Sequence, residues 1–277
     1  MNHTTFFACL RDTHRSIGVA PGSEIGDMAP DRAIFRHRGF AVEFPTLALI
    51  LALITGCTNS IATAQVNAGD AVVRSYVEIE QRENFAQLLW DYGENKILPT
   101  GFELQALLAL SHYPELQHVA IRFIVDDVSI PLSSRPHWAS MLHSARNRTY
   151  LVVIDNNLEG PRDVLLLKNQ PFNAQIGIIG HELAHTVYYL RRSFFGILAD
   201  ALCQLSDCHL EFERATDRRL IDYGLGWQRY DHARFVRARF GSAQPTTRSA
   251  EGGGAYLSPD ELLELIENNP VYSESHR

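Results

Sequence analysis

Apolar residues recur at three- and four-residue intervals in several stretches of the chain, which is the spacing that places them on one face of an α-helix. This periodicity predicts helices over residues 71–90, 101–110, 172–190, 193–205 and 210–223. Near the end of the chain, Ser258 is a residue type favoured at a helix N-cap. Pro259 follows at the first helical position and Glu261 at the third. This combination predicts a terminal helix over residues 259–267.

Strands are predicted where Val, Ile and Leu are concentrated in short runs. Three runs have this composition, at residues 119–130, 149–155 and 164–168. The polar stretch 131–148, between the first two runs, is predicted to be a long loop. Together, the helices and the few strands predict an α+β domain over residues 71–277, which is enough chain for one sizeable core.

The front of the chain has the order of regions found in a secretory signal. Arginines at positions 32, 36 and 38 precede an apolar run at 44–56, and Cys57 follows. The run is too short to span a bilayer as a helix. Its end, Leu53-Ile54-Thr55-Gly56-Cys57, resembles the lipobox of bacterial lipoproteins, which implies cleavage before Cys57 and a lipid on that cysteine.

We therefore expect an over-extended start at residues 1–27, a lipoprotein signal peptide at 28–56, and a small polar tether at 57–70. A buried core helix or an uncleaved anchor is the alternative interpretation of the apolar run. A lipidated Cys57 would attach the protein to a membrane of the cell envelope. Because Thr58 is not the aspartate associated with inner-membrane retention, the periplasmic side of the outer membrane is favoured.

Composition and charge exclude several other classes. Hydrophobic residues make up 45% of the chain and charged residues 21%, which is ordinary for a globular protein. The formal net charge of −7 argues against a nucleic-acid partner. Four cysteines are too few for a disulfide-dense scaffold. The sequence gives no indication of an oligomeric state.

Candidate chemistry is concentrated in the sequence His181-Glu182-Leu183-Ala184-His185, within an apolar segment. Positions i and i+4 share one face of a helix, so both imidazoles can bind one Zn²⁺. Glu182 is suited to act as the general base that deprotonates a water at the metal.

A catalytic zinc site needs a third protein ligand. Glu213 is the first candidate because Asp217 follows it at i+4, where a carboxylate can accept the N–H of a ligating histidine. Glu211 is the rival, but Ala215 stands four residues after it. His209 is a candidate fourth ligand that would close the site.

His181–His185 followed by Glu213-x-x-x-Asp217 resembles the gluzincin metallopeptidases with HExxH and ExxAD motifs, the group of the CAAX prenyl endopeptidases and their soluble periplasmic relatives. The resemblance covers residues 176–221. It implies a zincin-like domain with a small sheet, an active-site helix and a downstream ligand helix. It also implies His181, His185 and Glu213 as ligands, Glu182 as base and Asp217 as the residue that orients a histidine.

Two features depart from that family. Thr216 stands where the family has Ala, and only 28 positions separate His185 from Glu213, without membrane hairpins between them. The expected function is a zinc endopeptidase acting on a peptide or protein substrate in the bacterial cell envelope. The alternatives are a zinc hydrolase of a non-peptide amide, and a non-catalytic zinc-binding lipoprotein.

Other residues are candidates for supporting roles. Tyr256 is the first candidate for stabilising an oxyanion, with His232, Tyr223 and Tyr230 as alternatives. Residues 149–155 are the candidate edge strand that would pair with an extended substrate, and an interior strand is the alternative. Cys203 and Cys208 are expected to form a disulfide if the chain is exported. Residues 229–240 are predicted to form a basic amphipathic helix that faces either lipid phosphates or solvent.

Overall fold

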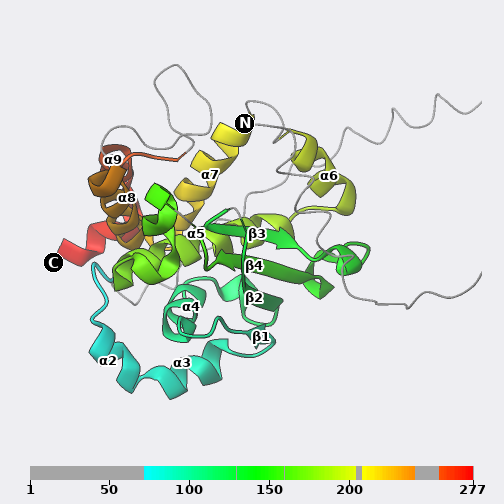
Figure 1. Ribbon diagram of the computed structural model, residues 1–277, viewed down its shortest axis with the longest axis horizontal. Helices are drawn as coiled ribbons and strands as arrows, with labels where there is room; N and C mark the ends of the chain where they lie inside the picture. The colour runs from blue at the N-terminus through cyan, green and yellow to red at the C-terminus, as the bar shows by residue number, and fades with distance from the viewer. Residues whose placement is uncertain (1–71, 129, 159, 204–207, 241–255, 277) are drawn as a thin grey trace, which may run out of the picture. The chain divides into compact units, whose positions relative to one another are not determined.

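The computed structural model describes residues 72–128, 130–158, 160–203, 208–240 and 256–276, which belong to one domain. The domain mixes helices with a four-stranded sheet, as the sequence predicts (Figure 1). The predicted signal peptide, the tether and the lipidation site Cys57 lie outside the described residues.

The sheet has the strand order β1-β2-β4-β3. Strands β1 (Lys96–Ile97), β2 (Ala120–Asp126) and β4 (Thr149–Asp155) are parallel, and β3 (Leu132–Pro136) is antiparallel to β4. Residues 149–155 therefore form an interior strand, and the prediction that they form the edge strand is wrong. The two edge strands are β1 and β3, and β3 lies inside the stretch predicted to be a loop.

The sequence conceals β3 because the strand reads Leu-Ser-Ser-Arg-Pro, with one large aliphatic residue. β3 pairs with β4, which follows it in the chain. Its extended conformation therefore depends on this tertiary contact rather than on the strand propensity of its own residues. The predicted strand at 164–168 is also wrong. The 3₁₀ helices η5 (Gly160–Leu165) and η6 (Leu167–Asn169) occupy this stretch, Leu166 lies between them, and Leu166 and Leu167 are buried. A short apolar run does not by itself distinguish a strand from helical structure.

The helices follow the predicted periodicity closely, except at the front. Where one helix was predicted over 71–90, the structure has two short helices within residues 78–92, divided at Asn84. The bounds of the helices are α2 (Glu78–Glu83), α3 (Phe85–Tyr92), α4 (Glu103–Leu110), α5 (Phe172–Leu190), α6 (Phe194–Cys203), α7 (Cys208–Asp222), α8 (Gly226–Phe240) and α9 (Pro259–Glu267). The capping box of α9 is present, with Ser258 and Glu261 each bonded to the other's backbone N–H.

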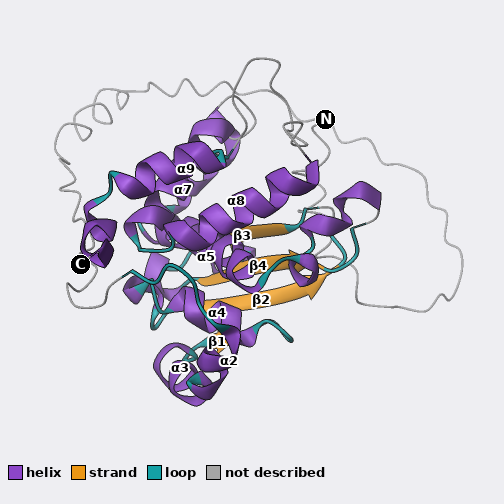
Figure 2. Cartoon of the chain, turned by 90° about the vertical axis from the view of Figure 1, so that its left-hand side faces the viewer, coloured by secondary structure: helices purple, strands orange, loops and turns teal. Residues whose placement is uncertain are grey.

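Helix α5 lies at the centre of the domain, where it packs against α4, α7, α8 and strand β3 (Figure 2). It is buried along most of its length, which explains why apolar residues surround its whole circumference. Gly177 permits a close approach of α8: a Cβ at this position would lie 2.2 Å from the backbone oxygen of Gln228. On the sheet side, Thr186 Oγ1 lies 2.8 Å from Ser134 Oγ of β3. These contacts fix α5 between a helix and the edge of the sheet.

Candidate metal centre

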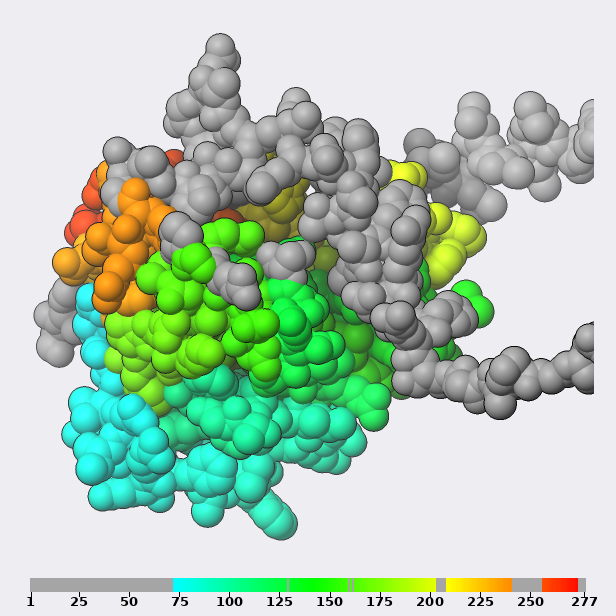
Figure 3. Space-filling view, in the orientation of Figure 1, coloured from blue at the N-terminus to red at the C-terminus, as the bar shows by residue number. Residues whose placement is uncertain are grey.

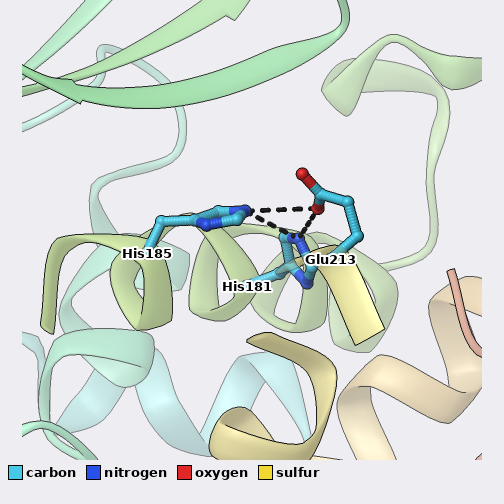
Figure 4. A group of neighbouring side chains, drawn as sticks. All are labelled: His181, His185 and Glu213. Carbon is cyan, nitrogen blue, oxygen red and sulfur yellow. Dashed lines mark hydrogen bonds and ion pairs between the residues drawn. The ribbon is translucent and has the colours of Figure 1, made fainter. Parts of the chain in front are cut away.

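His181 and His185 project from α5 on the same face, one helical turn apart (Figure 4). Both side chains are buried, and their Nε2 atoms are 3.1 Å apart. Neighbouring turns of a helix bring side chains at i and i+4 together, so the HExxH spacing produces this pair directly.

Glu213 reaches the same point from α7. Its Oε2 atom lies 3.0 Å from His181 Nε2 and 3.3 Å from His185 Nε2. Ligand bonds of 2.0–2.1 Å at tetrahedral angles place ligand atoms about 3.3 Å from one another. The three atoms therefore form a triangle of the size that one tetrahedral metal ion requires, and this buried group can hold a metal ion.

The two rival ligands lie elsewhere. The Glu211 side chain is 71% exposed and is paired with Arg218 at 2.8 Å, so it points into solvent. His209 Nδ1 lies 3.7 Å from the other oxygen of Glu213, at the outer side of the carboxylate. Of the two carboxylates that the sequence offered, the structure brings Glu213 to the histidines.

Asp217 accepts a hydrogen bond from His181 Nδ1 at 2.8 Å, as predicted for the carboxylate that orients a ligand. This bond leaves Nε2 of the same ring facing Glu213. The Asp217 carboxylate is completely buried, and it also accepts from Arg229 Nε at 2.7 Å and from the backbone N–H of Leu257 at 3.1 Å. Burial alone would raise the pKa of Asp217, but the charges of Arg229 and His181 outweigh burial and hold the pKa well below its usual range.

Arg229 is the residue of this network that the sequence reasoning missed. It belongs to the segment 229–240, where a face directed at lipid or solvent was expected, yet Arg229 is only 2% exposed and His232 is also buried. Helix α8 does have a solvated side, which carries Arg234, Arg237 and Arg239. The opposite side faces the candidate metal site. Because arginine is usually exposed, the sequence pattern gives no sign that Arg229 is buried.

Thr216, the departure from the ExxAD pattern, contacts the second histidine. Its Oγ1 atom lies 3.2 Å from His185 Nδ1 and donates to the backbone oxygen of Phe212 at 2.9 Å. With its own proton committed to Phe212, the hydroxyl oxygen is available to accept from Nδ1–H. Each histidine thus has its own orienting partner, and His185 also stacks on the Phe212 ring at 4.9 Å.

Glu182 follows His181 on α5 and is buried beside both imidazoles. Burial raises its pKa, and the nearby His185 and His181 offset only part of this effect. A carboxylate with a raised pKa is better suited to accept and return a proton near neutral pH.

Tyr256 is the one predicted oxyanion candidate whose ring touches a metal-ligand side chain. Its ring centroid is 5.5 Å from that of His181, in an edge-on arrangement, and the residue is 41% exposed. The bond from the neighbouring Leu257 N–H to Asp217 holds this segment against the site. The negative charge of Glu213 raises the pKa of the Tyr256 phenol well above its ordinary value, so the phenol keeps its proton.

The three alternatives to Tyr256 have other partners. Tyr223 donates to Glu115, and His232 Nδ1 lies 2.7 Å from Gln170 Oε1 in the interior. Tyr230 packs against Trp227, and the guanidinium groups of Arg74 and Arg234 lie over its ring.

Cys208, the first residue of α7, is disulfide-bonded. The side chain of Cys203 lies outside the described residues, so its pairing with Cys208 stays a prediction.

Comparison of the chain with protein-family models, with curated proteins and with solved structures gives no match. Within the described ranges, no helix combines the length and the apolar character that a membrane span requires.

Proposed function

We propose that the chain is a zinc-dependent endopeptidase of zincin-like architecture that acts in the bacterial cell envelope, attached through a lipid on Cys57. The observation that carries this proposal is the triangle of His181, His185 and Glu213, with ligand atoms 3.0–3.3 Å apart. Two nitrogens and one carboxylate oxygen, with no thiolate, are the donor set of zinc hydrolases.

When bound, zinc would polarise the substrate carbonyl and lower the pKa of a water molecule. Glu182 takes the proton from the attacking water and then delivers it to the leaving amine. Tyr256 donates a hydrogen bond to the carbonyl oxygen as negative charge develops on it. Asp217 and Thr216 keep the two imidazoles in the tautomer that directs Nε2 at the metal.

An extended peptide has a surface to pair with at β3, because this strand forms the edge of the sheet beside α5. Addition of a substrate strand provides backbone hydrogen bonds without demanding particular side chains. The link from Ser134 of β3 to Thr186, next to His185 in sequence, supports placing the substrate close to the metal ligands.

Substitution of Glu182 by Gln tests the proposal on the full chain. We expect the variant to keep its zinc, measured by metal analysis of the purified protein, and to hydrolyse a peptide library about 10²–10⁴-fold more slowly. Glu211→Gln is the matched control, because Glu211 is an exposed carboxylate of the ligand helix, and it should behave as wild type. Undiminished hydrolysis in the Glu182 variant would contradict the assignment.

The same assay separates the alternatives. Digestion of long peptides supports the endopeptidase, whereas turnover restricted to small non-peptide amides supports the other hydrolase. Zinc binding without hydrolysis of either substrate in the wild type would support a non-catalytic lipoprotein.

A further inference from the structure

Helix α6, which follows α5 directly in the chain, presents apolar side chains to solvent. Phe195 is 77% exposed, Leu198 45% and Leu202 63%. Their spacing of three and four residues places them along one outward stripe. The opposite side of the helix holds the polar contacts, since Asp200 accepts from Arg192 Nε at 2.8 Å and from Tyr188 Oη at 3.0 Å. Apolar residues are therefore present both on this outward stripe and on the inner side of the helix, where Ile197 is buried in the core.

A neighbouring loop extends this apolar surface. Leu142, between 3₁₀ helices η3 (Trp138–Ser140) and η4 (Ala145–Asn147), is 87% exposed. Leu142 and Phe195 line a shared hollow of about 670 Å³ between the loop and the start of α6. The yellow-green helix α6 reaches the surface at the right-hand side of the molecule (Figure 3). Two separate segments thus contribute to one exposed apolar surface.

The rim of this surface is basic, although the whole chain carries a net charge of −7. The described residues that line the hollow include no carboxylate, and its exposed basic lining residues are His143, Arg191 and Arg192. Arg148 also lines the hollow, but it is buried and its guanidinium donates to the backbone oxygens of His143 and Arg192. Arg191 and Arg192 face Glu115 and Asp200, yet their side chains remain 54% and 37% exposed. Arg146 adds a further exposed cation beside Leu142.

A second exposed apolar region, on α2 and α3, has the opposite charge. Ile79 is 72% exposed and Trp90 83%. The helices that carry them also carry acidic residues, at Glu78, Glu80, Glu83 and Asp91. Both regions therefore expose apolar side chains, but only the surface around α6 has basic residues at its rim.

We propose that α6 and residues 141–146 form a docking surface for an anionic phospholipid bilayer. Phe195, Leu198, Leu202 and Leu142 would enter the boundary between headgroups and acyl chains. Arg146, Arg191 and Arg192 would meet lipid phosphates. An amphipathic helix with aromatic and aliphatic residues on one side and arginine beside them is suited to lie in this interface. The surface is independent of the metal ligands, so this inference goes beyond the proposed hydrolase.

The position of α6 gives the docking surface a consequence for the site. Helix α6 joins α5, which carries His181 and His185, to α7, which carries Glu213. Docking through α6 would hold the metal centre close to the bilayer and favour membrane-proximal substrates.

Hydrogen exchange of the full chain, followed by mass spectrometry, tests the surface without relying on the lipid anchor. Vesicles of phosphatidylglycerol and phosphatidylcholine should slow exchange in residues 141–146 and 194–202 and leave residues 78–92 unchanged. Vesicles of phosphatidylcholine alone should give at least fivefold less protection. Equal protection by both kinds of vesicle, or none in the two segments, would overturn the proposal.

Variants complete the test by measuring the vesicle concentration that gives half-maximal protection. Phe195→Glu/Leu202→Glu should raise this concentration about tenfold or more, because two apolar insertions are lost. Arg146→Glu should raise it about fivefold. Ile79→Glu/Trp90→Glu is the matched control and should change nothing. Protection of α6 that appears without vesicles and grows with protein concentration would identify a second copy of the chain as the occupant and overturn the lipid assignment.

Discussion

The Arg229 guanidinium lies 2.7 Å from the Asp217 oxygen that also accepts from His181 at 2.8 Å, and both members of this ion pair are closed to solvent. Through this pair, the hydrogen bonds that begin at His181 continue to Arg229 on α8. A buried carboxylate is tolerable only while its charge is compensated. The orientation of His181 therefore depends on a residue that does not approach the metal.

Replacement of Arg229 by Met should lower the free energy of unfolding by about 3–5 kcal/mol, because Asp217 would be left buried without its guanidinium partner. Urea denaturation of the metal-free protein measures this loss. Arg74→Met is the control, since Arg74 pairs with Asp231 on the surface of the same helix, at 3.2 Å. An exposed pair contributes at most about 1 kcal/mol. Equal losses in the two variants would show that burial of the Asp217 pair has no special weight.

Thr216→Val should weaken zinc binding about tenfold, because it removes the hydroxyl that faces His185 Nδ1 while it preserves the shape of the side chain. Thr216→Ser should restore the wild-type affinity. Competition with a chromophoric chelator provides the measurement. If Thr216→Val and Thr216→Ser bind zinc equally well, the hydroxyl does not orient the ring.

Zinc affinity should increase with pH up to about pH 9. Burial lowers the pKa of His181, but Asp217 and Glu213 outweigh burial and raise the pKa of His181 to about 9 in the metal-free protein. Zinc binds the neutral imidazole, so below this pH each binding event must release a proton and the apparent affinity falls about tenfold per pH unit.

Chelator competition across this pH range measures the effect. Asp217→Asn removes the larger of the two raising influences, so its affinity should stop increasing at a lower pH than that of the wild type. A wild-type plateau near pH 6.5, the ordinary pKa of histidine, would contradict this prediction.

Gly177→Ala should destabilise the protein by about 1–3 kcal/mol or more, because the added Cβ would lie 2.2 Å from the backbone oxygen of Gln228. Backbone atoms cannot rotate away as a side chain does, so α8 would have to move. Gly196→Ala on α6 is the matched control: its nearest neighbour would be Ser193 Oγ at 3.4 Å. The control should be neutral or slightly stabilising, since alanine favours a helix. Thermal unfolding of both variants tests the difference.

The sequence predicted the parts of the site that depend on local geometry. The i, i+4 rule places His181 beside His185, and it places Asp217 one turn after Glu213. Most of the site therefore lies on α5, which has the predicted bounds, and on α7, which was predicted at 210–223 and runs from Cys208 to Asp222. The convergence of Glu213, rather than Glu211, on the histidines followed from the need for an orienting carboxylate, and the structure confirms it.

The parts that were missed depend on contacts between distant segments. Strand β3 has a polar sequence and acquires its conformation by pairing with β4. Arg229 is buried because Asp217 compensates its charge, which no local pattern reveals. Thr216 was noted only as a departure from the family's alanine, since its sequence neighbours do not show that its hydroxyl faces His185.

The candidate metal ligands precede and follow α6 in the sequence, and His181 and Glu213 are 32 positions apart. An ion shared by these residues would close a loop around α6, so the energy of metal binding would also be energy that restrains this segment. If α6 rests on lipid, metal content and membrane affinity become thermodynamically linked, and such linkage is reciprocal. Membrane binding would then raise the affinity of the protein for the ion, and removal of the ion would lower its affinity for the membrane.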